Sequence, residues 1–318
     1  MSNTPSATPV TDFVGELKFR AKTQGYLPRG LAFAATIIVI LMLVIILGNI
    51  VFHGIGTISW EFLSKAPEQG LEAGGIFPDI IGTLFLVILM VITGVPIGVL
   101  TAIYLQEYTS PDSKITRVIR IAINNLAGVP SIVFGLFGLG FFVGFIGSNM
   151  DSLILQSETP IWGQPAIIWA SLTLALLTLP VVIISTEEAL KTIPRELKDA
   201  SYALGATKLQ TIVRVLIPQA LPGIFTGAIL AVSRGAGEVA PIMFTGAAYY
   251  LPYLPSKLTD QFMELGYHVF VMATQSPDVE KTLPILYGTV LVLLVLTFLL
   301  NFVAILIRSR IRSRRISA

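Results

Sequence analysis

Long apolar stretches alternate with shorter polar connections along most of this chain. A bilayer core requires about 20 mostly apolar residues in each helix that crosses it. The stretches that meet this requirement cover residues 31–52, 80–105, 121–147, 166–185, 219–246 and 284–307. Because lipid offers no hydrogen-bond partner to the backbone, each of them is expected to be helical. The pattern predicts an all-α, polytopic membrane protein with six transmembrane helices.

Composition supports this class and removes several others. Hydrophobic residues make up 54% of the 318 residues, charged residues only 13%, and the mean hydropathy is +0.80. No ordinary soluble domain has these values. The chain has no cysteine, and its two histidines, His53 and His268, lie far apart in sequence. We therefore expect no metal site, and we expect both histidines to lie at the membrane interface without a special role.

Positive charges near the ends of the apolar stretches predict the orientation in the membrane, since Lys and Arg resist translocation. Four polar segments, residues 18–29, 114–120, 191–214 and 308–315, together carry 17 of the 21 basic residues. Lys65, Lys257 and Lys281 lie in the alternate connections, and Arg234 lies inside an apolar stretch. We expect both termini and the segment 186–218, called the polar island below, to be cytoplasmic.

The amino-terminal apolar stretch is too long for a cleavable signal peptide and predicts a signal anchor. The first 16 residues are rich in Ser, Thr and Pro and are expected to be disordered. The predicted organisation is a cytoplasmic tail over 1–29, an anchor helix with an outside loop over 30–73, a main transmembrane domain over 74–308 and a basic tail over 309–318.

Small residues and prolines indicate how the helices pack and bend. Gly140 with Gly144, and Gly223 with Gly227, are four residues apart, a spacing that lets helix backbones approach closely in lipid. We expect these pairs to mark helix contacts. Three prolines, Pro96, Pro130 and Pro241, interrupt predicted spans and are expected to bend them.

One charge pair lies inside a predicted span. Arg234 and Glu238 are four residues apart, so both would project from one helix face. An unpaired charge at bilayer depth costs about 3 kcal/mol. Two interpretations remain open. The pair is a structural salt bridge, or Arg234 donates hydrogen bonds to an anion in a water-filled path while Glu238 orients it.

The polar island has the spacing of the EAA loop of ABC importer permeases. Its residues Asp199, Ala200 and Ser201 are followed by Gly205 and then by Pro218. Two short helices around a glycine turn would present a compact surface to another protein. The chain contains no GxxxxGK motif followed by Ser or Thr, the loop that binds nucleotide phosphates. We therefore predict a transport subunit without catalytic residues or an ATPase site of its own.

Several longer stretches resemble the PstA-type permease of the phosphate-specific ABC importer, a type I importer with a MetI-like transmembrane bundle. They are GGIFPDIIGT (74–83), LAGVPSIVFGLFGL (126–139), LTLPVVIISTEEALKTIP (177–194), DASYALGATK (199–208), SRGAGEVAPIMFTG (233–246) and ELGYHVFVMATQSP (264–277). The chain departs from the pattern locally. Val239 stands where the family commonly has Thr, and Asp199 and Ser201 replace the usual Glu and second Ala.

The resemblance implies an ATP-driven machine in the cell inner membrane that imports phosphate through a pore shared with a PstC-type permease subunit. A PstB-type ATPase dimer would bind ATP and Mg²⁺, so this chain needs no cofactor, and a periplasmic protein would deliver phosphate. Arg234 and Glu238 would line the substrate path. Asp199, Ala200, Ser201, Gly205 and Pro218 would belong to the surface that contacts the ATPase. Beyond these subunits and the lipid bilayer, no nucleic-acid partner is expected.

Two other functions stay open from the sequence. The cargo could be another oxyanion such as sulfate or molybdate, or the chain could be a membrane receptor that senses phosphate without transporting it. A channel or an ion-coupled carrier is less favoured. Such carriers usually have several ionisable residues within the membrane or an internal repeat, and neither is evident in the sequence.

Overall fold

The computed structural model describes residues 10–110, 112–156 and 159–316, with side chains described between residues 28 and 310. It separates into two compact units, Met1–Phe52 and His53–Ala318. Apart from one small hairpin, the elements are helices. In chain order they are α1 (Val10–Gly54), η1 (Ile55–Thr57), α2 (Trp60–Ser64), β1 (Pro67–Glu68), η2 (Gln69–Leu71), β2 (Ala73–Gly74), α3 (Phe77–Ile103), η3 (Tyr104–Tyr108), α4 (Lys114–Leu126), α5 (Ser131–Phe137), η4 (Gly138–Gly147), η5 (Met150–Leu155), α6 (Ile167–Lys191), α7 (Arg195–Ala203), α8 (Lys208–Thr211), η6 (Ile212–Leu216), α9 (Ile217–Gly235), α10 (Ile242–Thr245), α11 (Leu265–Gln275) and α12 (Val279–Ile316).

Within the described ranges, six helices are long and apolar enough to cross a membrane, as predicted. They cover Pro28–Thr57, Phe77–Tyr108, Ser131–Leu155, Ile167–Lys191, Lys208–Gly235 and Val279–Arg310. η3, η4, η5 and η6 are π-helical continuations within these spans. Most apolar side chains between Leu31 and Ile46 on the first span are exposed, as expected for a surface that contacts lipid.

The amino-terminal unit differs from the expectation in one respect. Residues 1–9 lie outside the described part, but α1 already begins at Val10, so residues 10–16 are helical rather than disordered. Residues 10–27 contain no proline, so no backbone donor is missing from this part of α1.

The centre of the second unit is α6, which packs against α3 on one side and α9 on another. The largest buried cluster joins Leu86 and Met90 of α3, Leu174 of α6 and Val232 of α9. A second cluster, nearer the α6–α7 connection, contains Ile103, Leu190 and Leu216 among others. These contacts among α3, α6 and α9 fix the position of the carboxyl end of α9, where Arg234 lies.

Some of the predicted glycine contacts are present and others are not. A Cβ on Gly223 would meet the Ala189 side chain of α6, and one on Gly227 would stand 2.9 Å from Cβ of Ser185. By contrast, no atom lies within 4 Å of the corresponding position at Gly140, and Gly144 meets only the Leu139 carbonyl. The prediction for Gly140 and Gly144 was wrong within the described chain, where Gly138 is the glycine of η4 that approaches α6, at Thr173.

Two predicted spans have different boundaries because a proline separates helices instead of bending one. Pro130 stands between α4 and α5, so the predicted span 121–147 becomes an amphipathic helix followed by a new span that starts at Ser131. Pro241 stands between α9 and α10, and the fifth span therefore runs from Lys208 to Gly235. Pro96 lies inside α3, which continues past it.

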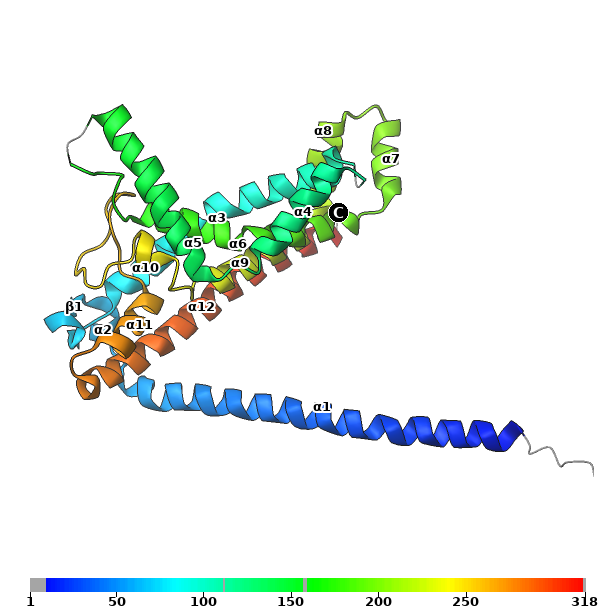
Figure 1. Cartoon of the computed structure of the whole chain (residues 1–318), viewed down its shortest axis with the longest axis horizontal. Helices are drawn as coiled ribbons and strands as arrows, with labels where there is room; N and C mark the ends of the chain where they lie inside the picture. The colour runs from blue at the N-terminus through cyan, green and yellow to red at the C-terminus, as the bar shows by residue number, and fades with distance from the viewer. Residues whose placement is uncertain (1–9, 111, 157–158, 317–318) are drawn as a thin grey trace, which may run out of the picture. The chain divides into compact units, whose positions relative to one another are not determined.

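Figure 1 shows the second unit as a bundle with two different ends. At one end lie α4, α7, α8 and the end of α12, which are the segments that the charge pattern places together. At the other end lie α2, α11 and the hairpin, in which Pro67 pairs with Gly74 and Glu68 with Ala73. We call these the knob end and the hairpin end, and we call residues 195–211 the knob.

Candidate translocation and coupling sites

Arg234 lies in the last turn of α9, at the point where the helix unwinds. The peptide N–H of Gly237 donates to the carbonyl of Arg234 (3.3 Å), and that of Glu238 donates to the carbonyl of Gly235 (3.4 Å). The following residues, 236–241, form a turn that we call the strap. The helix ends here because glycines are poor helix formers and because the residue before Pro241 disfavours helical backbone angles.

The strap carries Glu238 back to Arg234. Nε of Arg234 donates to Oε1 of Glu238 at 3.1 Å, and the two side chains are 36% and 19% exposed. The predicted pair therefore exists, but it joins a helix end to a turn instead of lying along one helix face. Among the described residues, the terminal guanidinium nitrogens of Arg234 have no hydrogen-bond partner. Four N–H donors, two on each terminal nitrogen, thus remain without a partner on a side chain whose charge is already balanced.

Two neighbouring helices, α3 and α11, contact the residues on either side of the Arg234–Glu238 pair. A Cβ on Gly235 would collide with Sδ of Met90 on α3, so α3 and α9 are in close contact one residue from Arg234. On the other side, Cγ2 of Val239 lies 3.2 Å from the position of a Cβ on Gly266 of α11. The Arg234–Glu238 pair is therefore supported by α3 through Gly235 and by α11 through the strap.

The polar island contains the predicted pair of short helices around a glycine turn. Gly205 has φ +81°, a left-handed conformation that favours glycine. The peptide N–H of Ala206 donates to the carbonyl of Ser201 (3.2 Å), which closes the carboxyl end of α7. Thr207 and Gln210 then form a reciprocal capping box that starts α8. Local sequence chemistry thus determines the shape of the knob.

The structure places the five predicted coupling residues in different surroundings. Asp199 and Ala200 are exposed on α7, and Gly205 forms the turn. The hydroxyl of Ser201 bonds that of Thr211 at 2.9 Å, so it joins the two knob helices internally. Pro218 lies in the first turn of α9, outside the knob. Sequence spacing did not reveal Leu204, which is 90% exposed at the tip of the turn.

Two polar contacts join the knob to the second span, and no sequence pattern predicted them. Nζ of Lys198 on α7 lies 2.5 Å from Oε1 of Glu107 on η3, whose side chain is only 7% exposed. Nζ of Lys208 lies over the ring of Tyr108, 4.6 Å from its centroid, a cation–π distance. A movement of the knob would therefore act directly on the end of the helix that begins at Phe77.

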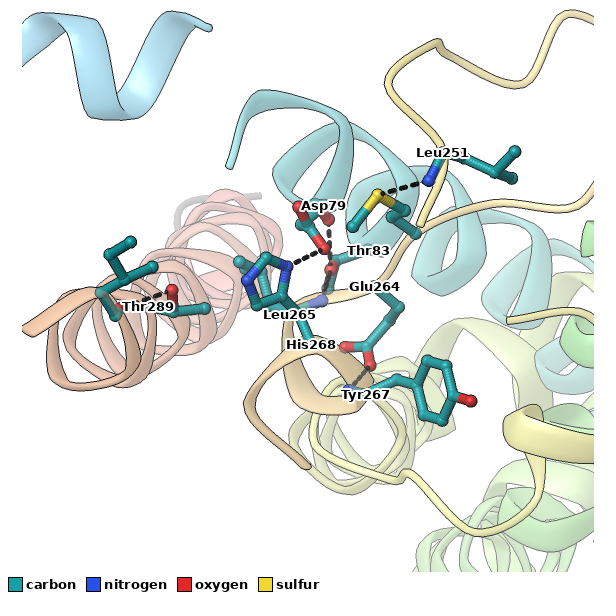
Figure 2. A network of polar contacts seen from close by, with 10 residues as sticks. Asp79, Thr83, Leu251, Glu264, Leu265, Tyr267, His268 and Thr289 are labelled. Carbon is teal, nitrogen blue, oxygen red and sulfur yellow. Dashed lines mark hydrogen bonds and ion pairs between the residues drawn. The ribbon is translucent and has the colours of Figure 1, made fainter. Parts of the chain in front are cut away.

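A third polar group lies at the hairpin end and was also missed. Nδ1 of His268 lies 2.9 Å from Oδ1 of Asp79, and both side chains are buried (Figure 2). The expectation of an interfacial histidine was wrong for His268, because α11 packs inward onto α3 and α12. The partners are 189 residues apart, so no local spacing could indicate the pair. In the part of the chain that is described, no group of three or more His, Asp or Glu residues is arranged to hold a metal ion.

Comparison with protein families gives the decisive observation. Residues 94–316 match the family described as binding-protein-dependent transport system inner membrane component. The chain belongs to this family. It is therefore a transport component and a multi-pass inner membrane protein, while the side on which its termini lie stays a prediction.

Relatives of this permease include phosphate transporters. It is 33% identical over 257 residues to the probable ABC transporter permease protein YqgI of Bacillus subtilis, covering 76% of this chain and 82% of that protein. It is 32% identical over 272 residues to the probable phosphate transport system permease protein PstA of Methanocaldococcus jannaschii, covering 86% and 89%. With PstA 1 of Mycobacterium tuberculosis (strain CDC 1551 / Oshkosh) it is 38% identical over 177 residues, about half of each chain (56% and 52%). The predicted resemblance to PstA-type permeases is confirmed.

Solved structures support the fold of this permease. A bacterial alginate ABC transporter in complex with an alginate-bound periplasmic protein aligns with a TM-score of 0.63 at 14% identity, covering 94% of this chain and 97% of that one. The MetNI methionine ABC transporter in an inward-facing conformation aligns with a TM-score of 0.50 at 19% identity, covering 74% and 94%. At these identities the likeness concerns the fold alone, and it confirms the predicted type I importer bundle.

Proposed function

We propose that this permease subunit carries inorganic phosphate into the cell, with Arg234 and Glu238 lining the substrate path and the knob receiving a separate ATPase. The observation that carries the proposal is the state of Arg234, which is balanced by Glu238 yet keeps its terminal nitrogens free. Guanidinium binds oxyanions through paired parallel hydrogen bonds, which is the geometry that phosphate offers. The adjacent carboxylate lowers the net positive charge, so that a bound anion can leave again.

Phosphate is the proposed cargo because the PstA proteins among the relatives carry that name, and their similarity extends over most of the transmembrane part. Partner subunits follow from the family, since a permease of this class works with an ATPase and a substrate-binding protein. We infer that the specific partners are a PstC-type permease, a PstB-type ATPase dimer and a periplasmic phosphate-binding protein, and that both termini face the cytoplasm. On this proposal ATP and Mg²⁺ bind the ATPase.

Contacts within the chain provide a route from the knob to the path. Lys198 and Lys208 connect the knob to Glu107 and Tyr108 at the end of the second span. The same continuous helix packs through Met90 against Gly235, beside Arg234. Closure of an ATPase pair on the knob would therefore move the second span as a rigid rod and change the surroundings of Arg234. This is a rigid-body form of alternating access.

The cargo is tested by competition in vesicles that contain the complete importer and internal ATP. Uptake of labelled phosphate is measured against excess unlabelled phosphate, sulfate or molybdate. We expect unlabelled phosphate to suppress uptake, while sulfate and molybdate leave it unchanged. Equal suppression by sulfate, or no uptake with all partners and ATP present, would contradict the phosphate assignment.

A further inference from the structure

Three ionisable side chains meet where α11 packs on the start of α3, at the hairpin end. Asp79 lies in the first turn of α3, His268 lies in the first turns of α11, and Glu264 caps that helix by accepting the Tyr267 N–H at 2.7 Å (Figure 2). Their exposures are 0%, 3% and 1%. Thr83 completes the group, since its hydroxyl donates to the Asp79 carbonyl (2.7 Å) and accepts the Leu265 N–H (3.1 Å).

The group contains more charge than its hydrogen bonds can balance. Asp79 and His268 bond each other through one atom each, which leaves Oδ2 of Asp79 and Nε2 of His268 buried without a partner among the described residues. Two carboxylates and one imidazole in a buried site are most stable when their net charge is close to zero. To reach such a net charge the group must bind protons. Loss of the last proton would leave both carboxylates negatively charged.

Glu264 is the side chain on which that proton rests. Burial raises the pKa of Glu264 to about 7, and the charge of Asp79 adds to the rise, although the peptide N–H groups of Gly266 and Tyr267 and the Thr83 hydroxyl oppose it. On α12 the polar side chain beside the group is Thr289, whose hydroxyl bonds the Ile285 carbonyl of its own helix.

Several other charged groups near this end form ion pairs outside the buried group. On the strap, Glu238 is bound to Arg234. Glu72, from the loop before α3, faces Lys281 at 3.8 Å. Lys281 in turn bonds Asp278 at 3.1 Å. The proton balance of the buried group therefore depends on Asp79, Glu264 and His268 themselves.

The group is next to the proposed substrate path. Gly266, two residues after Glu264, is in contact with Val239 of the strap. Tyr267 packs against the buried cluster that contains Ala236, the first residue of the strap. A shift of the first turn of α11 would therefore move the strap, and with it the carboxylate that balances Arg234.

We propose that Asp79, Glu264 and His268 form a proton-binding site whose occupancy determines how tightly α11 and the strap are held on α3. With the proton on Glu264, the only negative charge is that of Asp79 and α11 stays docked. When the proton leaves to solvent, the α3–α11 contact contains a second buried negative charge that is repelled by Asp79, and the contact loosens. Its effect on transport rests on the proposed function, and we expect uptake to fall as pH rises through about 7.

Glu264→Gln tests the transport effect, because Gln keeps an oxygen for the Tyr267 N–H and stays neutral. Phosphate itself titrates in this range, so the quantity measured is the ratio of variant to wild-type uptake in the complete importer at each pH. We expect this ratio to be constant below about pH 6, to rise between about pH 6 and pH 8, and to stay at the higher value above that. Glu68→Gln, an exposed change on β1, should give a constant ratio. A constant ratio for Glu264→Gln would overturn the proposal.

Thermal stability of the purified permease tests the site without transport. A carboxyl whose folded pKa is raised from 4.5 to about 7 makes stability fall as pH rises between these values. The Tm of wild type should therefore fall relative to Glu264→Gln over that window. Asp79→Asn removes the repelling charge, so the folded pKa of Glu264 should fall and the decrease in Tm should end at a lower pH. This second variant tests the proton site if Glu264→Gln does not fold. Tm profiles of wild type and variants that run parallel would refute the proton site. Absence of phosphate uptake by the wild-type importer would refute only the proposed function.

Discussion

Lys198 and Glu107 join the knob to the second span, with Nζ and Oε1 2.5 Å apart. The Glu107 side chain is almost completely buried, so its carboxylate depends on this one lysine for charge balance. Removing a single partner of a buried pair leaves an uncompensated charge, which costs more than the pair contributes. The contact is therefore a specific mechanical link and a point where knob and helix can be uncoupled.

Lys198→Ala should weaken this link by up to about 3 kcal/mol, reduced from a fully buried pair because the lysine is partly solvated. We expect ATP hydrolysis by the complete importer to continue while phosphate moved per ATP falls. The charge reversal Lys198→Glu with Glu107→Lys should recover part of the lost coupling. If Lys198→Ala transports phosphate with the wild-type ATP ratio, the knob does not act through Glu107.

Gly205 tests the shape of the knob through backbone conformation alone. At φ +81° a residue with a Cβ costs about 1–2 kcal/mol, and no atom lies within 4 Å of that Cβ position. Gly205→Val should therefore distort the turn and reduce the amount of ATPase that copurifies. Gly205→Asn is the matched control, since Asn tolerates this conformation. Equal ATPase retention by the two variants would contradict the assignment of the turn.

Leu204 tests whether the tip of the knob inserts into a partner. A leucine that is 90% exposed on a turn contributes little to the stability of this chain. Leu204→Ser should change the free energy of unfolding of the purified permease by no more than about 0.5 kcal/mol, leave its Tm nearly unchanged, and weaken ATPase binding. A lower Tm with unchanged ATPase binding would show that Leu204 supports the fold of this chain and does not contact the ATPase.

A pair of glycines tests the helix packing. Gly223→Val places a side chain against Ala189 of α6, whereas Gly140→Val meets open space. The first should lower the Tm of the purified chain, since overpacking costs about 1–3 kcal/mol, and the second should not. If the second lowered the Tm as much as the first, valine in a helix and not the α6–α9 contact would be responsible.

The sequence predicted those parts of the fold and site that depend on local chemistry. Apolar length was sufficient for six spans, and the spacing around Gly205 was sufficient to predict two short helices at a glycine turn, although not the Thr207–Gln210 capping box. The boundaries near Pro130 and Pro241 were misassigned, because apolar composition continues across the non-helical residues that separate two helices.

Contacts between distant segments could not be predicted in the same way. Asp79 meets His268, and Glu107 meets Lys198, through tertiary packing that leaves no spacing in the sequence. Arg234 and Glu238 were found because they are close in sequence, but their geometry depends on the unwinding of α9 after Gly235. Charge pairs between distant segments were therefore the contacts that sequence patterns consistently failed to predict.

Binding of the transported anion by Arg234 is tested by Arg234→Ala in the complete importer. Vesicle uptake of phosphate, subunit stoichiometry and ATPase activity would be measured together, with Arg117→Ala on the exposed face of α4 as the control. The account predicts that the Arg234 variant assembles with its partners but takes up no phosphate, while the control transports normally. Phosphate uptake at the wild-type rate by an assembled Arg234→Ala importer would contradict it.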